Sequence, residues 1–229
     1  VLNALDAAAH GAQVCPRTPL TAAHRIDGGW ALETPAGKFT ARALINAAGP
    51  AVLQVDGLVG ETPEYGMRLV RGSHIVVRKL FDHPYAYFFQ LADGRIFFAI
   101  PYERNFTLIG TTDEDHKGDP GKPHISEAES EYLLKAVSEY FKRPVTKEQV
   151  RWAYSGIRPL YDDGASKAQE ATRDYVLKLD HPEGGAPLLS VFGGKITTFR
   201  RLSEHAMEKI QPFFPQLGKP WTHDAPLPG

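Results

Sequence analysis

The chain has 229 residues, of which 42% are hydrophobic and 23% charged, as expected of a soluble globular protein of one or two domains. Its formal net charge of -1 excludes the global basic field typical of nucleic-acid-binding proteins. The single cysteine, Cys15, can form neither an internal disulfide nor a thiolate metal site, which fits a reducing compartment. No apolar stretch reaches the length of a membrane span.

The first fifty residues combine a helix, a small sheet and a strand. Residues 1–10 place apolar side chains at helical spacing, and Gly11 follows where a C-cap is expected. Alternating segments at 21–25, 30–34 and 38–41, separated by glycine turns, predict an antiparallel meander. An apolar strand then leads into Ala47, Ala48 and Gly49, whose small side chains would let the backbone approach a ligand. An ordinary β-turn is the alternative.

The middle of the chain predicts a separate sheet. Strands are expected at 67–79, 85–91, 95–101 and 106–112, and the short turns between them favour antiparallel pairing of neighbours along the chain. Ser126 and Glu129 form a capping box for a helix that runs to about Lys142 and covers one face of the sheet. Its expected buried stripe is Tyr132, Leu133, Ala136, Val137, Tyr140 and Phe141.

The last part returns to strands and a glycine turn. Strands are expected at 150–158 and 174–179, joined by a mobile polar loop over 162–166. A buried strand at 188–192 leads into Gly193, Gly194 and Lys195, and Thr197 or Thr198 can cap the following helix. This turn would suit a group with negative oxygens along one edge, such as a phosphate or the N1/C2-carbonyl edge of a reduced flavin. A glycine turn with a solvated lysine is the alternative.

Six motifs occur in order along the chain: Asn46-Ala-Ala-Gly-Pro50, Arg71-Gly-Ser-His-Ile-Val-Val77, Ile109-Gly-Thr-Thr-Asp113, Tyr154-Ser-Gly-Ile-Arg-Pro-Leu160, Thr172-Arg-Asp-Tyr175 and Phe192-Gly-Gly-Lys-Ile-Thr-Thr198. With them the chain resembles the FAD-dependent glycerol-3-phosphate dehydrogenases of bacteria, relatives of the glycine and sarcosine oxidases. The resemblance implies a mixed α+β fold, with an antiparallel substrate domain covered by helices and part of a Rossmann-like FAD-binding domain. We expect FAD-domain parts at 1–60 and 191–229 and the substrate domain at 61–190.

The resemblance also implies an activity. Members oxidise sn-glycerol 3-phosphate to dihydroxyacetone phosphate, pass electrons from FAD to a quinone, and form homodimers on the inner face of the cell membrane. The family's G-x-G-x-x-G turn has no match here, so we expect it before Val1, and the helical C-terminal domain after Gly229. The chain is then an internal piece, inactive by itself. An isolated anion-binding piece and an amine or amino-acid oxidase are the alternatives.

Four side chains are the candidates for the chemistry that the resemblance implies. His74 would take the substrate's hydroxyl proton or hold that hydroxyl. Arg158, held extended by Pro159, would orient and polarise the substrate's oxygens; its alternative is a surface ion pair with Asp162 or Asp163. The planar guanidinium of Arg173 suits the phosphate, and its alternative partner is Asp174. Lys195 would lie beside the N1 edge of the reduced flavin or help to hold the phosphate.

Two further groups are candidate FAD contacts by resemblance. Gly194, Lys195, Ile196, Thr197 and Thr198 would bond the carbonyl side of the flavin ring, although plain helix capping is open for the threonines. Val14, at the end of a short strand, and Ala47, Ala48 and Gly49 would contact the adenosine end. The Gly-Thr-Thr-Asp turn that contains Thr111, Thr112 and Asp113 is expected to be structural only. The scattered histidines indicate no metal site.

Overall fold

The chain folds into two compact units. The structure, a computed structural model, describes every residue except 61–65, 163, 165–170 and 229. Unit 1 consists of Val1–Gly66 and Arg173–Gly229, and unit 2 of Met67–Thr172. The chain re-enters unit 1 at Arg173 rather than at residue 191 as expected, because the two strands that follow pair with each other and with a strand of the N-terminal part.

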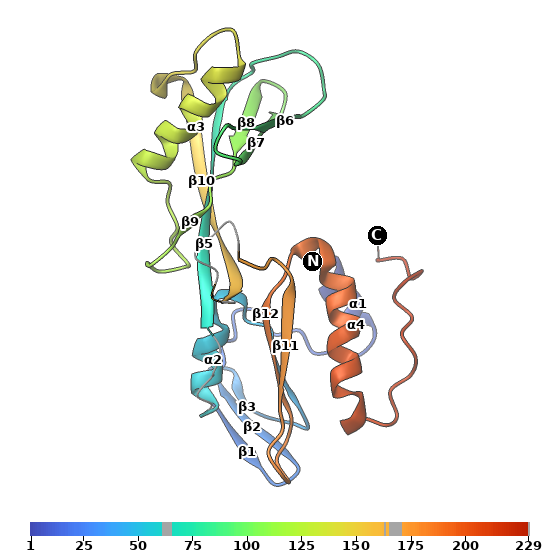
Figure 1. Ribbon diagram of the computed structural model, residues 1–229. Coiled ribbons are helices and arrows are strands. Elements are labelled where there is room, and N and C mark those ends of the chain that lie inside the picture. Colours follow the sequence, from blue (N-terminus) through green and yellow to red (C-terminus); the bar gives the residue numbers. More distant parts are fainter. Residues whose placement is uncertain (61–65, 163, 165–170, 229) are drawn as a thin grey trace. The chain divides into compact units, whose positions relative to one another are not determined.

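Unit 1 is built on a three-stranded sheet with a helix on each face. The sheet order is β11 (Tyr175–Asp180), β12 (Leu188–Gly193), β4 (Leu44–Asn46), and only β12 and β4 run parallel. Leu189 packs against α4 (Phe199–Ile210), whereas Ser190 bonds to α2 (Val52–Leu58). Since successive strand residues point to opposite faces, α4 and α2 cover opposite faces of the sheet (Figure 1).

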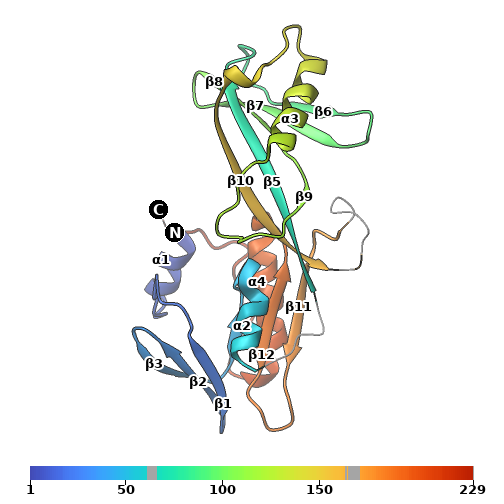
Figure 2. The same ribbon diagram turned by 90° about the vertical axis from the view of Figure 1, so that its left-hand side faces the viewer.

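The rest of unit 1 contains the predicted meander and one unpredicted helix. After α1 (Leu2–Ala9), strands β1 (Ala22–Ile26), β2 (Gly29–Thr34) and β3 (Gly37–Ala41) form an antiparallel ribbon, as expected (Figure 2). Fully buried Trp30 donates from its Nε1 to the carbonyl oxygen of Pro187 at 3.0 Å, which joins the ribbon to the segment before β12. The sequence did not predict α2, which follows a 3-10 turn over Gly49–Ala51.

Unit 2 is a larger sheet whose order differs from the order along the chain. Its strands are β5 (Gly66–Arg78), β6 (Tyr87–Gln90), β7 (Ile96–Tyr102), β8 (Phe106–Gly110), β9 (Glu114–Asp115) and β10 (Val150–Asp162). The order is β10-β5-β8-β7-β6, with β9 also paired to β5. The expected pairing of β5 with β6 is wrong, because β5 pairs with β8 on one side. On its other side β5 pairs with β10, so that these two long strands are neighbours.

The predicted helix α3 (Glu127–Tyr140) covers one face of this sheet, and its capping box between Ser126 and Glu129 is present. Its apolar side packs on a core that includes Ile75, Val77, Phe97, Ile109, Leu133, Ala136 and Val137. Tyr140, expected in the buried stripe, is 45% exposed at the end of the helix. Because Ile75 and Val77 point toward α3, Gly72 and His74 lie on the opposite face. The loop expected over 162–166 falls largely outside the described residues.

Candidate functional site

The structure brings His74 and Arg158 together in unit 2, on the sheet face opposite α3. Ser73 and Ser155 meet on the α3 side, with their hydroxyl oxygens 2.8 Å apart. By strand alternation, His74 of β5 and Arg158 of β10 therefore project to the other side. The positive charge of Arg158 is near enough to contribute to the lowered pKa of His74, after the larger effect of burial. Two of the four predicted side chains thus share one surface.

Three acceptors in the turn after β8 clamp the guanidinium of Arg158. Its Nη1 donates to Asp113 Oδ1 at 2.7 Å and to the Thr112 carbonyl oxygen at 3.3 Å, and its Nη2 donates to Thr111 Oγ1 at 2.8 Å. These bonds use three of the five N–H groups of an arginine. Thr111 donates to the Thr112 carbonyl oxygen, as expected of a structural turn, and the turn also holds Arg158, which was not expected.

Asp113 was not predicted from the sequence as the partner of Arg158. The alternative considered for Arg158 was an ion pair with Asp162 or Asp163, which are near in sequence, but the ion pair forms with Asp113, 45 residues away. Asp163 lies outside the described residues. The Gly-Thr-Thr-Asp motif was the sequence signal that pointed to Asp113. The motif could not be matched to Arg158, because their contact depends on the order of strands in the sheet, and the neighbours of β5 were predicted wrongly.

Two glycines provide the space in which these side chains lie. A Cβ atom on Gly72 would overlap both terminal nitrogens of Arg158 and lie 2.6 Å from its Cζ. A Cβ atom on Gly110, the residue directly opposite His74 in the β5–β8 pair, would lie 2.6 Å from His74 Cγ and 2.8 Å from Nε2. Contacts this short do not occur between real side chains, so any side chain at either position would displace its neighbour.

His74 is held as a neutral imidazole. Burial lowers its pKa below the ordinary value of 6.5, and the nearby charge of Arg158 lowers it further. The Nδ1 atom is buried and has no hydrogen-bond partner among the residues that the structure describes. A histidine in this state is ready to accept a proton at neutral pH, which is what a general base requires.

Glu129 of α3 anchors the strands beneath this surface. Its Oε1 accepts hydrogen bonds from the hydroxyls of Ser73 (2.8 Å) and Thr112 (2.7 Å), and its Oε2 pairs with Arg71 at 2.7 Å. Burial by itself would raise the pKa of Glu129, but hydrogen bonds from Ser126, Thr112, Ser73 and Arg71 lower it to about 2. One buried carboxylate therefore fixes the backbone next to His74 and next to the Arg158 clamp.

Unit 1 brings most of its predicted residues to one edge of the three-stranded sheet. Strands β4 and β12 are parallel, so the segments after them, Ala47 to Gly49 and Gly194 to Thr198, start from the same edge. Tyr175, the first residue of β11, pairs with Gly193 at the end of β12, which places Arg173 at this edge as well. The carboxyl ends of parallel strands are the usual ligand-binding edge of such sheets.

The turn at this edge has no side chain on its backbone at Gly193 and Gly194, as predicted. Gly194 has a φ of +91°, and a Cβ atom there would lie 3.1 Å from Tyr175 Cβ, so only glycine fits. Lys195 is exposed, and Ile196 is 87% exposed. Thr198 stands at the N-cap position of α4, but its hydroxyl donates to the Lys195 carbonyl oxygen at 2.9 Å and caps no helical N–H. The alternative that the side chain of Thr198 simply caps α4 is therefore wrong.

Val14 is the exception among the predicted unit 1 residues. It was expected at the end of a short strand, but it lies in an irregular segment after α1 and is 48% exposed. Among the described residues no strand pairs with this segment, and a short strand does not form without a partner.

A buried polar network holds the two parallel strands of unit 1 together. Asp56 of α2 accepts from Asn46 Nδ2 at 2.7 Å and from Ser190 Oγ at 2.6 Å. Asn46 ends β4, and its Oδ1 accepts from the Ala48 N–H at 3.3 Å, so the same network supports the turn at the candidate edge.

We expect Asp56→Ala to reduce the free energy of unfolding by about 2 kcal/mol, because it leaves the buried Ser190 hydroxyl without its acceptor. Urea unfolding followed by circular dichroism measures the loss. Asp27→Ala, at an exposed turn position, is the matched control, and equal effects of the two substitutions would contradict this assignment.

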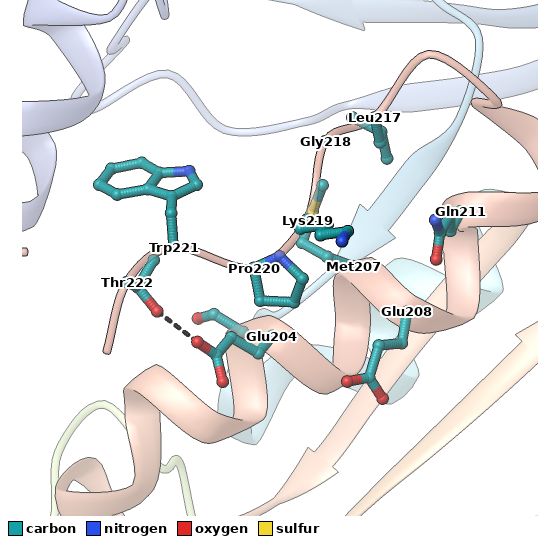
Figure 3. A pocket seen from close by; sticks show the side chains of 11 residues that line it. Glu204, Met207, Glu208, Gln211, Leu217, Gly218, Lys219, Pro220, Trp221 and Thr222 are labelled. Atoms are coloured by element: carbon teal, nitrogen blue, oxygen red, sulfur yellow. Dashed lines mark hydrogen bonds between the residues drawn. The ribbon is translucent and has the colours of Figure 1, made fainter. Parts of the chain in front are cut away.

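A separate pocket of about 470 Å³ lies in unit 1 between α4 and the segment from Leu217 to Thr222. Figure 3 shows Met207 and Trp221 at its wall and the hydrogen bond of 2.6 Å from Thr222 Oγ1 to Glu204. The described residues that line this pocket include none of the predicted site residues. We therefore assign it no part in the predicted chemistry.

Comparison with known proteins decides the family. Residues 1–200 match the family described as FAD dependent oxidoreductase. The chain belongs to this family. The match covers most of the chain and both units, so the resemblance predicted from the six motifs is confirmed.

Close relatives carry two different names. A glycerol-3-phosphate dehydrogenase of Pseudomonas aeruginosa is 48% identical over 100% of this chain and 46% of its own length. A D-erythritol 1-phosphate dehydrogenase of Brucella abortus is 47% identical over 100% of this chain and 47% of its own length. The chain therefore spans about half the length of the curated relatives it matches.

A solved relative supports the fold. The X-ray structure of the glycerol-3-phosphate dehydrogenase from Bacillus halodurans, complexed with FAD, aligns with a TM-score of 0.75 at 25% identity. It covers 95% of this chain and 42% of the relative. The predicted mixed fold, with antiparallel sheets within an FAD-dependent oxidoreductase, is thus confirmed.

Proposed function

We propose that this chain supplies the substrate-contacting part of an FAD-dependent dehydrogenase that oxidises a phosphorylated polyol, with glycerol 3-phosphate as the first candidate. One observation carries the proposal: a neutral histidine and a clamped arginine share one sheet face, in a chain 48% identical along its length to a glycerol-3-phosphate dehydrogenase. We infer that unit 2 is the substrate domain and that unit 1 is part of the FAD-binding domain.

His74 is the proposed general base. Loss of the hydride from a secondary alcohol requires loss of the hydroxyl proton, which a ring nitrogen of His74 would accept. The lowered pKa keeps the imidazole neutral at pH 7, so a proton acceptor is available without prior deprotonation. Protonation of His74 below this pKa should remove activity on the acid side, and the decline should occur at a lower pH than for an ordinary histidine.

Arginine and lysine side chains have the proposed task of holding the substrate's oxygens. Arg158 is aimed by its clamp and keeps two N–H groups, on Nη2 and Nε, without a partner among the described residues. Arg173 is the proposed phosphate ligand, because its planar fork suits phosphate oxygens and stays charged at any working pH. Lys195 is proposed to neutralise either the phosphate or the N1 side of the reduced flavin.

The residues at the edge of the unit 1 sheet fit one side of a flavin. Gly194 has no side chain in the way of a flat ring, and exposed Lys195, Ile196 and Thr197 and half-buried Thr198 follow it. Ala47, Ala48 and Gly49 at the same edge are the proposed contacts to the adenosine part, with Val14 as a further one. When bound, FAD would accept the hydride from the substrate carbon. The chain has no G-x-G-x-x-G turn, so these residues would hold only part of the cofactor.

D-Erythritol 1-phosphate is the second candidate substrate. The relative of that name is 47% identical over the whole chain, which is nearly the value for the glycerol-3-phosphate dehydrogenase. Both compounds carry a phosphate on a polyol, so the proposed roles of Arg173 and His74 apply to either. The two differ in length by one carbon, and they are distinguished by the binding test below.

Electron transfer to a quinone, attachment to the inner face of the membrane and a homodimer belong to the same proposal. A relative in Escherichia coli, 45% identical to this chain, is named aerobic glycerol-3-phosphate dehydrogenase, which favours an acceptor of the respiratory chain. Across the described part of the chain, no helix is both long and apolar enough to span a bilayer.

Thermal unfolding in the presence of ligands tests the substrate class. We expect glycerol 3-phosphate, added with FAD, to raise the Tm of the chain, and Arg173→Ala to abolish this rise by removing the phosphate ligand. Glycerol and glycine are the negative controls, and D-erythritol 1-phosphate is run in parallel. Protection by glycine instead of the phosphates would favour an amino-acid oxidase, and an equal rise in both proteins would count against Arg173.

A further inference from the structure

The imidazole of His74 packs against both strands that flank β5, which are β8 and β10. On the β8 side, Gly110 has no side chain, and the ring lies over its Cα. From β10, the ring of Tyr154 stacks on the imidazole, with the ring centroids 5.0 Å apart and the planes only 4° from parallel. Trp152 supports Tyr154 in turn, at 5.1 Å between centroids.

These packing contacts decide the orientation of the His74 ring, which the backbone alone leaves free. The second side-chain torsion of histidine has a broad distribution, so a histidine on a strand needs packing to hold its ring plane. His74 Nδ1 finds no hydrogen bond among the described residues that could fix the ring instead. The parallel stack with Tyr154 is therefore the contact that defines the plane of the imidazole.

The hydroxyl group of Tyr154 does not explain its position. It makes no hydrogen bond to any residue that the structure describes, and the side chain is partly exposed. Burial raises the pKa of this phenol, and Tyr102 adds to the effect, so the group is neutral at pH 7. What Tyr154 contributes to His74 is thus an uncharged aromatic face that excludes water.

We propose that Tyr154 is the positioning residue of His74, which it holds in one plane and shields from water through its aromatic face. The role in catalysis rests on the proposed function, because it requires His74 to be the base. Among the described residues, the charged and titratable groups near His74 are Arg158 and Tyr154 from β10, and Tyr102 of β7 lies near Tyr154. Asp113 forms an ion pair with Arg158.

The decisive measurement is the pKa of His74, followed by NMR titration of the imidazole signals and assigned with a His74→Asn variant. In the Tyr154→Ser variant, water reaches the ring and the pKa should rise toward 6.5, the ordinary value. In Tyr154→Phe the aromatic face remains, and the pKa should stay where it is in the original chain. Circular dichroism verifies the fold, and Tyr154→Thr, which suits a strand and is also too small to cover the ring, replaces the serine variant if that one unfolds.

Two results would overturn the proposal: an unchanged pKa of His74 in the folded serine or threonine variant, or the same rise in Tyr154→Phe as in Tyr154→Ser. This titration uses no substrate, so its outcome does not depend on the proposed activity. That activity is tested separately, by kcat/KM for glycerol 3-phosphate against pH in the full-length protein. There Tyr154→Ser should lower the maximum about 10-fold and shift the acid limb upward. A moved pKa with an unmoved acid limb would reject His74 as the base and leave its positioning by Tyr154 intact.

Discussion

In the full-length protein, Gly72→Ala should lower kcat/KM for glycerol 3-phosphate about 100-fold while the protein still folds. The added methyl group would overlap the guanidinium of Arg158. Because this group is the far end of a flexible side chain, it can move away without disturbing the sheet. It would then lose its bonds to Thr111 and Asp113, and with them the orientation that the proposed chemistry needs.

The control for this prediction is Gly156→Ala in β10. Gly156 lies two residues before Arg158, and a Cβ atom there would have no neighbour within 4 Å, so this substitution should have little effect on either activity or stability. In an Arg158→Ala background, Gly72→Ala should cause no further loss, because the group that it displaces is already absent. Additive losses in the double variant would show that Gly72 acts in some other way.

Glu129→Ala should reduce the free energy of unfolding of the chain by about 3 kcal/mol. The carboxylate is buried, and it accepts hydrogen bonds from Ser73 and Thr112 and pairs with Arg71. Its removal takes the counter-charge from Arg71 and the acceptor from the buried Thr112 hydroxyl, while the Ser73 hydroxyl can still bond to Ser155. Urea unfolding measures the loss, and Glu131→Ala, on the exposed side of the same helix, should change stability by less than about 0.5 kcal/mol.

The same residue predicts a pH dependence. The pKa of Glu129 is about 2 in the folded chain against an ordinary value of 4.5, so its contribution to stability is complete above pH 4.5 and is lost as the pH falls toward 2. The original chain should therefore lose more stability across this range than Glu129→Ala does. Parallel acid unfolding curves for the two proteins would contradict the assignment.

Short-range patterns in the sequence were reliable guides. The capping box of α3, the meander of β1 to β3 and the strand before Gly194 were all predicted correctly, because each depends on residues only a few positions apart. The six motifs also led to the correct family. The helix α2 was missed because it is short and its sequence carries no strong helix signal. Its stability comes instead from tertiary contacts of the buried residues Val52 and Asp56.

The sequence by itself determined the family, the local elements and the choice of His74, Arg158, Arg173 and Lys195 as candidates. Only the tertiary structure decided the surroundings of these side chains: Asp113 as the partner of Arg158, Gly72 and Gly110 as the space for two of them, and Tyr154 as the neighbour of His74. The physical reason is the sheet order β10-β5-β8, which brings together residues that are far apart in the chain. Strand alternation gives the face on which each side chain lies, but only the pairing of strands decides which side chains meet there.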